Sequence, residues 1–184
     1  GCIREDAVLI DALTAASRLF AADSCYLVIQ DGGQTTPLMR YAHAPIGDHR
    51  LVRAYDEHYS KLNPFRQFIG RPEHLGRSYS SCAMVAPGEL ERSEFYNDFC
   101  RKLDWRYIVA GAFHNRDNRL GYIIMNRAAG AGPFDIHAEA ALDQLLPHLA
   151  NAYAMRMSFS DAFSSVERAL FHGEQKQAGI IFLD

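Results

Sequence analysis

The segment Glu89–Arg127, ELERSEFYNDFCRKLDWRYIVAGAFHNRDNRLGYIIMNR, decides the fold of this chain. Its first part, Glu94–Lys102, predicts a short helix, and Ser93 just before it suits an N-cap. Apolar side chains recur there at every fourth position and form one stripe: Phe95, Phe99 and Leu103. After this helix the spacing of the apolar residues changes from every fourth position to every second position.

The part after Asp104 predicts two strands joined by a tight turn. Alternate positions are apolar on both sides, which is typical of a strand covered on both faces. One face takes Trp105, Tyr107, Val109, Gly111 and Phe113, and the other takes Ile108, Ala110 and Ala112. Residues 115–118 are turn residues, because Asn and Asp tolerate positive φ. Leu120–Asn126 then returns as the second strand, and a hairpin this apolar belongs in the middle of a sheet.

Composition favours one globular domain with an appendage. The chain has 184 residues, of which 48% are hydrophobic, so it can bury a core without a metal or disulfide. Its formal charge is −3, with 19 basic and 22 acidic residues, which argues against direct contact with nucleic acid. The four cysteines lie far apart without a CxxC pair and indicate free thiols in a reducing cytoplasm. No apolar run or signal-peptide pattern indicates a membrane segment.

The region before the decisive segment predicts helices and a second hairpin. Glu5–Phe20 is an amphipathic helix, followed by a strand at Cys25–Gln30. Thr35–Tyr41 should pair with that strand at an edge of the sheet, because it contains a proline. Asp48–Leu62 predicts a helix with an aromatic stripe. Together these elements predict an α+β fold, in which helices flank a central antiparallel sheet.

A short connecting region follows the aromatic helix. Asn63-Pro64 ends the helix, because the residue before proline is pushed out of the α region. Phe65–Ile69 can form one further turn. The stretch 70–87 reads as a loop with one short strand at Ser80–Val85.

The longest predicted element is a helix from Asp135 to His172, capped by Asp135 and bent at Pro147. Its apolar residues fit two heptad positions: Leu142, Leu149, Phe163 and Leu170 at one, and Leu145, Ala152, Phe159 and Val166 at the other. At 1.5 Å per residue it spans more than about 50 Å, which favours a coiled-coil homodimer. Two shorter helices packed locally are the alternative. We expect Gly173 to end the helix and 178–184 to begin a strand of a following domain.

The sequence lacks the patterns of an enzyme or a metal site. It contains no nucleophile–base–acid order and no phosphate-binding loop. The eight histidines are scattered without metal-ligand spacing. We therefore expect no catalytic residues, no metal and no cofactor.

The candidate binding residues are aromatic side chains with a few polar tips, which is how a small-molecule pocket is lined. They come from the aromatic helix, its end and the first central strand: Tyr55, Tyr59, Asn63, Phe65, Trp105 and Tyr107. The small residues at 110–112 leave space above the sheet. An aromatic core that binds nothing is the alternative interpretation.

The chain resembles the N-terminal sensor region of LuxR-type bacterial transcription regulators. The resemblance rests on Tyr59-xxx-Asn63-Pro64, on SEFYNDF before the strand pair, and on GPFD before LLPHL. It implies a GAF/PAS-like domain that precedes a C-terminal helix-turn-helix, with residues 1–134 as sensor, 135–172 as dimerisation helix and 173–184 as the start of a following domain. Relatives that bind autoinducers carry an acid where this chain has Asn63. The resemblance therefore implies the architecture rather than an acyl-homoserine lactone ligand.

These patterns predict the sensory and dimerisation region of a transcription regulator. A small-molecule effector would bind over the sheet and shift the packing of the helix 135–172, and so act on a DNA-binding part outside this chain. A ligand-free dimerisation module and, less favoured, a small enzyme are the alternatives.

Overall fold

The computed structural model describes residues 2–31, 37, 39–43 and 49–177. The chain divides into two compact units, Gly1–Pro147 and His148–Asp184. The first unit holds the sheet and is described first.

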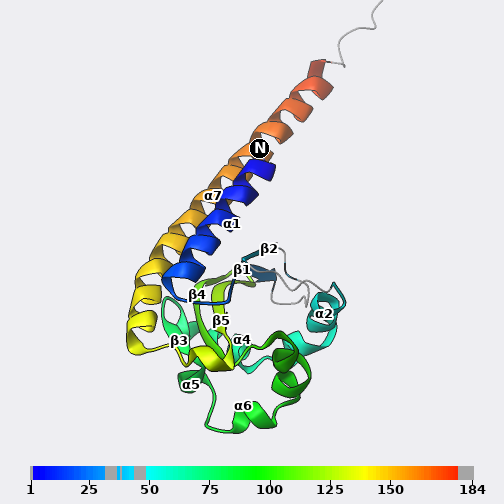
Figure 1. Ribbon diagram of the computed structural model, residues 1–184. Coiled ribbons are helices and arrows are strands. Elements are labelled where there is room, and N and C mark those ends of the chain that lie inside the picture. The colour runs from blue at the N-terminus through cyan, green and yellow to red at the C-terminus, as the bar shows by residue number, and fades with distance from the viewer. Residues whose placement is uncertain (1, 32–36, 38, 44–48, 178–184) are drawn as a thin grey trace, which may run out of the picture. The chain divides into compact units, whose positions relative to one another are not determined.

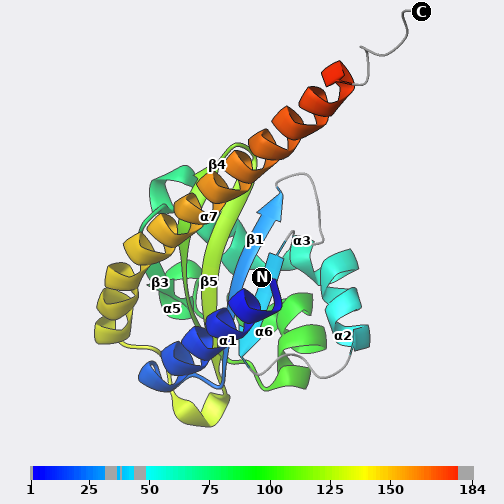
Figure 2. The ribbon, with the colours of Figure 1, turned by 90° about the horizontal axis from the view of Figure 1, so that it is seen from above.

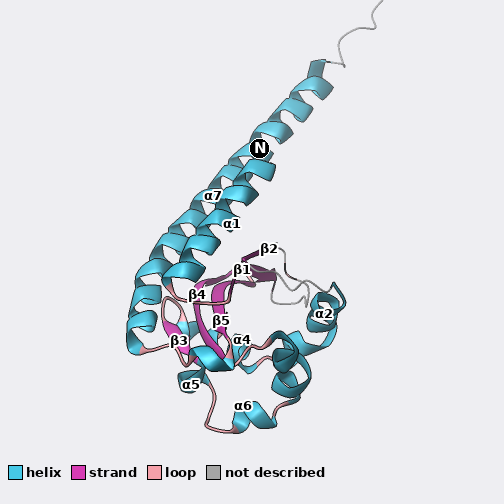
Figure 3. Cartoon of the chain, in the orientation of Figure 1, coloured by secondary structure: helices cyan, strands magenta, loops and turns pink. Residues whose placement is uncertain are grey.

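The sheet has five antiparallel strands in the order β2-β1-β5-β4-β3 (Figure 3). Their bounds are Ser24–Asp31 (β1), Met39–His43 (β2), Ser78–Ser80 (β3), Tyr107–Arg116 (β4) and Arg119–Arg127 (β5). The predicted hairpin forms β4 and β5, and each of these strands has a neighbour on both sides. The prediction of an α+β fold with a central antiparallel sheet is confirmed.

The turn of this hairpin follows from its sequence. Asp117 and Asn118 have φ values of 52° and 58°, which Asn and Asp accept more readily than other side chains. A change of register between Ala112 and His114 places a bulge in β4. The predicted turn chemistry is confirmed.

One face of the sheet is covered by α1 (Cys2–Leu19) and by the first turns of α7 (Ile136–Gln177), as Figures 1 and 2 show. Two side chains of α7 bind the edge strand β3. Asp143 Oδ1 accepts from the Ser78 amide at 2.6 Å, and Glu139 Oε1 accepts from the Ser80 amide at 2.7 Å. These bonds fix the start of α7 to the sheet.

The opposite face is covered by short helices (Figure 1). Their bounds are His49–Ala54 (α2), Ser60–Leu62 (α3), Pro64–Ile69 (α4), Ser81–Met84 (α5), Glu89–Arg92 (α6) and Cys100–Leu103 (η4). Two π-helical turns interrupt them, Tyr55–Tyr59 (η1) and Phe95–Phe99 (η3). Like η4, two further segments are 3₁₀ turns, Pro72–His74 (η2) and Ala129–Ala131 (η5).

Several predicted elements differ in detail. The strand expected at Ser80–Val85 is wrong: β3 ends at Ser80, and α5 follows. Of the pairing strand expected at Thr35–Tyr41, the last three residues belong to β2, which lies at an edge as predicted, and residues 35, 36 and 38 lie outside the described residues. Tertiary contacts decide these short segments, because three to five residues carry little periodicity.

The predicted helix Glu94–Lys102 is present as a π turn followed by a 3₁₀ turn. Ser93 acts at its start, where its hydroxyl oxygen accepts a hydrogen bond from the Tyr96 amide at 3.1 Å. The four-residue spacing therefore identified a helical segment but not its winding.

The second unit is the rest of α7, from His148 onward. The helix passes Gly173, where we expected it to end, and continues to Gln177. One glycine costs a helix only about 1 kcal/mol, which its neighbours can offset. The strand expected at 178–184 lies outside the described residues.

Candidate ligand pocket

A pocket with a cavity volume of about 220 Å³ lies between the sheet and the short helices. This is somewhat below the range of about 300–1,000 Å³ usual for ligand pockets, so it suits a compact ligand. Its lining is mainly apolar and aromatic: Tyr26, Val28, Arg40, Ala42, Val52, Tyr55, Asn63, Phe95, Phe99, Trp105, Ile108, Tyr122, Ile124 and Asn126.

The floor of the pocket is one face of the sheet. On β5 the lining residues are Tyr122, Ile124 and Asn126, which strand alternation places on the same side. The register puts Val28 of β1 beside Tyr122, and Arg40 of β2 beside Val28. Two polar positions therefore end the floor, with the apolar Ile124 between them.

The roof comes from the two π turns and the loop before β4. Phe99 is fully buried at its centre. Its ring centroid lies 5.2 Å from that of Tyr55, and 5.8 Å from that of Trp105 in an edge-on contact. Trp105 also meets Tyr26 of the floor edge-on at 5.6 Å. Such aromatic pairs hold the roof and the floor together. π turns are frequent at functional sites.

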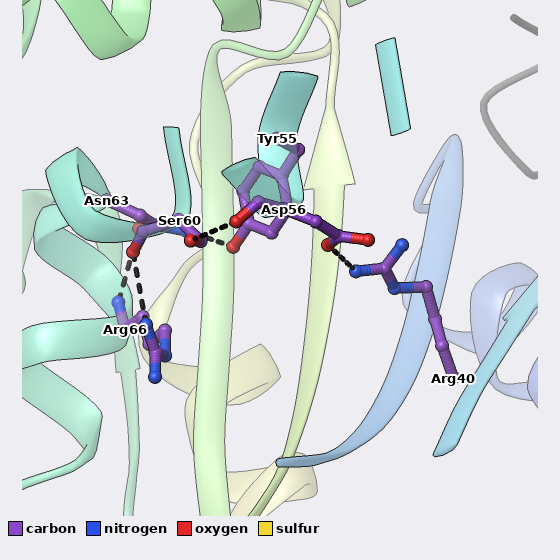
Figure 4. Close-up of polar contacts among 6 residues, drawn as sticks. All are labelled: Arg40, Tyr55, Asp56, Ser60, Asn63 and Arg66. Atoms are coloured by element: carbon purple, nitrogen blue, oxygen red, sulfur yellow. Dashed lines mark hydrogen bonds and ion pairs between the residues drawn. The ribbon is translucent and has the colours of Figure 1, made fainter. Parts of the chain in front are cut away.

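A hydrogen-bonded group closes one end of the pocket (Figure 4). Asn63 Nδ2 donates to the hydroxyl of Tyr55 at 2.9 Å, and that hydroxyl also shares a hydrogen bond with Tyr122. Asn63 Oδ1 points the other way and caps α4, where it accepts from the amides of Phe65 (3.0 Å) and Arg66 (3.2 Å). Both functional groups of Asn63 are therefore engaged within the protein.

An ion pair lies at the same end. The Arg40 guanidinium on β2 donates to the Asp56 carboxylate on η1 (Figure 4). It also lies 5.8 Å from the centroid of the Tyr55 ring. Both charged side chains are mostly buried, with exposed fractions of 24% and 15%. The pair joins the edge strand to the roof.

The tyrosine hydroxyls of the pocket are neutral hydrogen-bonding groups at physiological pH. Burial raises the pKa of Tyr26 to about 12, although a bond with Ser24 acts against this. Burial also raises the pKa of Tyr55 and of Tyr122, whose hydroxyls lie deep in the protein. The ring of Tyr55 is partly exposed even so. Neutral hydroxyls bind carbonyl and hydroxyl groups rather than acting as bases.

Asn126 ends the floor opposite to the tyrosine pair. The residue is 0% exposed, and its Nδ2 donates to Ser24 Oγ at 3.0 Å. Its Oδ1 is buried and receives no hydrogen bond from any residue that the structure describes. A buried hydrogen-bond acceptor without a donor is uncommon in folded proteins.

The structure brings together three of the six predicted site residues. Tyr55, Asn63 and Trp105 line the pocket. Trp105 does so because it precedes β4, and so escapes the alternation that would have put it on the face of Val109.

The other three predicted residues lie outside the lining. Tyr59 packs on Phe99 with a centroid distance of 5.1 Å but does not line the pocket. Phe65 is fully buried in the core beside Phe95. Tyr107 begins β4 on the opposite face, and the Arg106 guanidinium lies 5.0 Å from its ring.

Sequence reasoning missed several lining residues, notably Arg40, Tyr122 and Asn126. One signal was available for the last two. They are polar-tipped positions four residues apart on a strand otherwise apolar, and so share a face. The sequence around Arg40 contains no comparable pattern, because this residue reaches the pocket only through the pairing of β2 with β1.

No cluster of three or more metal-binding side chains occurs in the described part of the chain. Nor does any helix among residues 2–31 and 49–177 have the length and apolarity needed to cross a bilayer.

Comparison with solved structures places this architecture among ligand-binding domains. The VqsR LBD domain of Pseudomonas aeruginosa matches 84% of this chain and 87% of its own, with a TM-score of 0.63 and 16% identity. The LuxR-family factor CepR2 of Burkholderia cenocepacia, described as N-acylhomoserine lactone dependent, matches 78% and 81%, with a TM-score of 0.53 and 20% identity. The chain has the fold of LuxR-type ligand-binding domains.

A GAF domain/HD domain protein from Geobacter sulfurreducens also matches, over 81% of this chain and 91% of that one, with a TM-score of 0.52 and 15% identity. This confirms the GAF-like architecture. At sequence level, no family model and no curated protein matches the chain.

Proposed function

We propose that this chain is the sensory region of a bacterial LuxR-type transcription regulator, and that the pocket over its sheet binds a small amphipathic effector. The cavity beneath Tyr55 and Trp105 carries the proposal. A ligand-free module would need that space filled by side chains. An apolar cavity with a few convergent polar groups is the usual form of a small-molecule site.

The polar end of the pocket suits a carbonyl or other acceptor. The hydroxyls of Tyr55 and Tyr122 share one hydrogen bond, and Asn63 supplies its own proton to Tyr55. One of the two hydroxyl protons is thus left over, and no hydrogen bond among the described residues uses it. Arg40 offers further N–H donors beside the one that binds Asp56.

Asn63 does not support an acyl-homoserine lactone as the effector. In the relatives that bind autoinducers, an acid at this position receives the amide of the signal. Here the only acceptor of the side chain, Oδ1, is occupied by two backbone amides at the start of α4. We therefore propose that Asn63 holds Tyr55 and α4 in place.

A change in the pocket would reach α7 through strand β4, whose two faces point toward the pocket and toward α7. Ala110 and Ala112 of β4 face the side of the pocket, and Gly111 between them touches Leu146 of α7. A ligand that shifts β4 would therefore shift the start of α7. To take such a switch from 1:99 to 99:1, the ligand must prefer one state by about 5.5 kcal/mol.

The remaining parts of the proposal concern assembly and location. The part of α7 after Pro147 would form the homodimer in the cytoplasm, and the DNA contact would come from a part outside this chain. Within that part of α7, Phe159 at a predicted heptad core position is 72% exposed, which suits a surface that a second copy covers. A monomeric mass by light scattering at high protein concentration would refute the dimer and leave the pocket unaffected.

Trp105 is the sole tryptophan of the chain and lines the pocket, so its fluorescence reports occupancy directly. A library of small amphipathic molecules should contain members that shift this emission and raise the melting temperature together. The pocket-filling variant Ala42→Phe should abolish both effects. The matched variant Ala83→Phe, at an exposed position on α5, should retain them. If Ala42→Phe binds every such compound as the native protein does, the pocket is not the ligand site.

A further inference from the structure

The acceptor left unpaired at Asn126 constrains the ligand more tightly than the rest of the pocket does. Its Oδ1 is buried without a hydrogen-bond partner among the described residues, while its Nδ2 is held by Ser24 Oγ. Asn126 is among the residues that line the cavity, but its Oδ1 has almost no accessible surface, so a ligand group reaches it only when neighbouring side chains shift. A buried polar atom without a partner is unfavourable, so a ligand group that pairs with it binds more tightly.

The position of Asn126 sets the length of the ligand. Tyr122 and Asn126 are four residues apart on β5, which corresponds to about 13 Å along the strand. Between them the pocket wall is apolar, formed by Ile124 of the floor. The two polar ends of β5 are therefore separated by an apolar residue, and the Tyr26 hydroxyl beside it on β1 is already bonded with Ser24.

The two ends also differ in kind. The tyrosine end has a spare hydroxyl proton and the Arg40 guanidinium, which are donors. The Asn126 end has a spare carbonyl oxygen, which is an acceptor. A ligand that satisfies both ends carries an acceptor at one end and a donor at the other.

We propose that the effector is a compact molecule with a hydrogen-bond donor, a hydroxyl or N–H, that binds Asn126 Oδ1, and a carbonyl-type acceptor that binds the Tyr55–Tyr122 end across an apolar or aromatic body. This inference rests on the proposed function of the pocket and specifies the chemical class of its ligand. An apolar molecule with a single polar head leaves Asn126 unpaired, and is therefore a poorer ligand.

A matched pair of probes tests the donor. Methyl 3-(4-hydroxyphenyl)propanoate has a phenol and an ester at opposite ends, and methyl 3-phenylpropanoate lacks only the hydroxyl. Affinities are measured by calorimetry and by Trp105 emission. One net hydrogen bond corresponds to a preference of about fivefold to tenfold for the phenol.

Asn126→Leu removes the acceptor while keeping the branching of the heavy atoms, and should bring that preference to about one. Its main effect should be weaker binding of the phenol, with little change for the other probe. Asn126→Ala is the second variant if the first folds poorly. Asn151→Leu, which changes an exposed asparagine on α7 that does not line the pocket, is the control and should keep the full preference.

Each outcome decides the inference. Equal affinities in the native protein would overturn it, because a water alone then satisfies Asn126, while the pocket function stands. A preference that survives in Asn126→Leu would also overturn it, by placing the acceptor elsewhere. Binding of neither probe would overturn this ligand class, and the proposed function fails as well only if the wider library also leaves Trp105 unchanged.

Discussion

Gly111 is the point where the sheet and α7 come closest, and replacing it with alanine measures that contact. A Cβ at this position would lie 2.8 Å and 3.1 Å from the two Cδ atoms of Leu146, and 3.1 Å from the Arg77 carbonyl oxygen. Ordinary contacts between carbon atoms are about 3.5–4.0 Å. The Gly111 backbone does not have a positive φ, so the cost of Gly111→Ala is steric.

The magnitude follows from two opposing effects. Overpacking a buried site costs about 1–3 kcal/mol. Replacing glycine returns about 0.4–1 kcal/mol, because the unfolded chain loses freedom. The free energy of unfolding should therefore fall by about 1–2 kcal/mol. For a chain of this size the melting temperature should then fall by about 2–8 °C.

A double-mutant cycle with Leu146→Ala assigns the cost to its source. Leu146 is 1% exposed, so its truncation alone should cost about 2–5 kcal/mol. In that background Gly111→Ala should become neutral or slightly stabilising, because two of the three close contacts are gone. Urea denaturation of the four proteins gives the coupling energy.

Gly130→Ala is the matched control, because a Cβ there meets nothing within 4 Å. Its stability should stay within about 0.5 kcal/mol of the native value. An equal cost of Gly111→Ala with and without the Leu146 side chain would refute the contact between β4 and α7, and with it the proposed relay.

Two further predictions concern stability. Asn63→Ala should cost about 1–2 kcal/mol in urea denaturation, because α4 loses its cap and Tyr55 loses the Nδ2 donor; a cost below about 0.5 kcal/mol would contradict the capping role. Burial raises the pKa of the Cys25 and Cys100 thiols from the ordinary 9.0 to about 12. The unfolded chain therefore loses these protons first, so their contribution to stability is complete below about pH 9 and falls between about pH 9 and 12. Cys25→Ala/Cys100→Ala should flatten this alkaline decline, and an unchanged decline would assign it to other groups such as Tyr26.

Local sequence determined the central part of this fold. The two-residue alternation of β4 and β5, the Asp117–Asn118 turn and the long amphipathic stretches are properties of consecutive residues, so they could be read without knowing the tertiary structure. The aromatic character of the pocket was also visible, through Tyr55 and Trp105. Neither depends on how distant segments meet.

The composition of the pocket depended on contacts between distant segments. Arg40 reaches it only because β2 pairs with β1, and Asn126 ends its floor because β5 lies between β1 and β4. The side chains of Tyr59 and Phe65 do not line the pocket, because the π turn η1 and the start of α4 change the direction in which successive side chains point. Strand register and helix winding set the direction of each side chain, and both are fixed by the packing of the whole unit rather than by neighbouring residues.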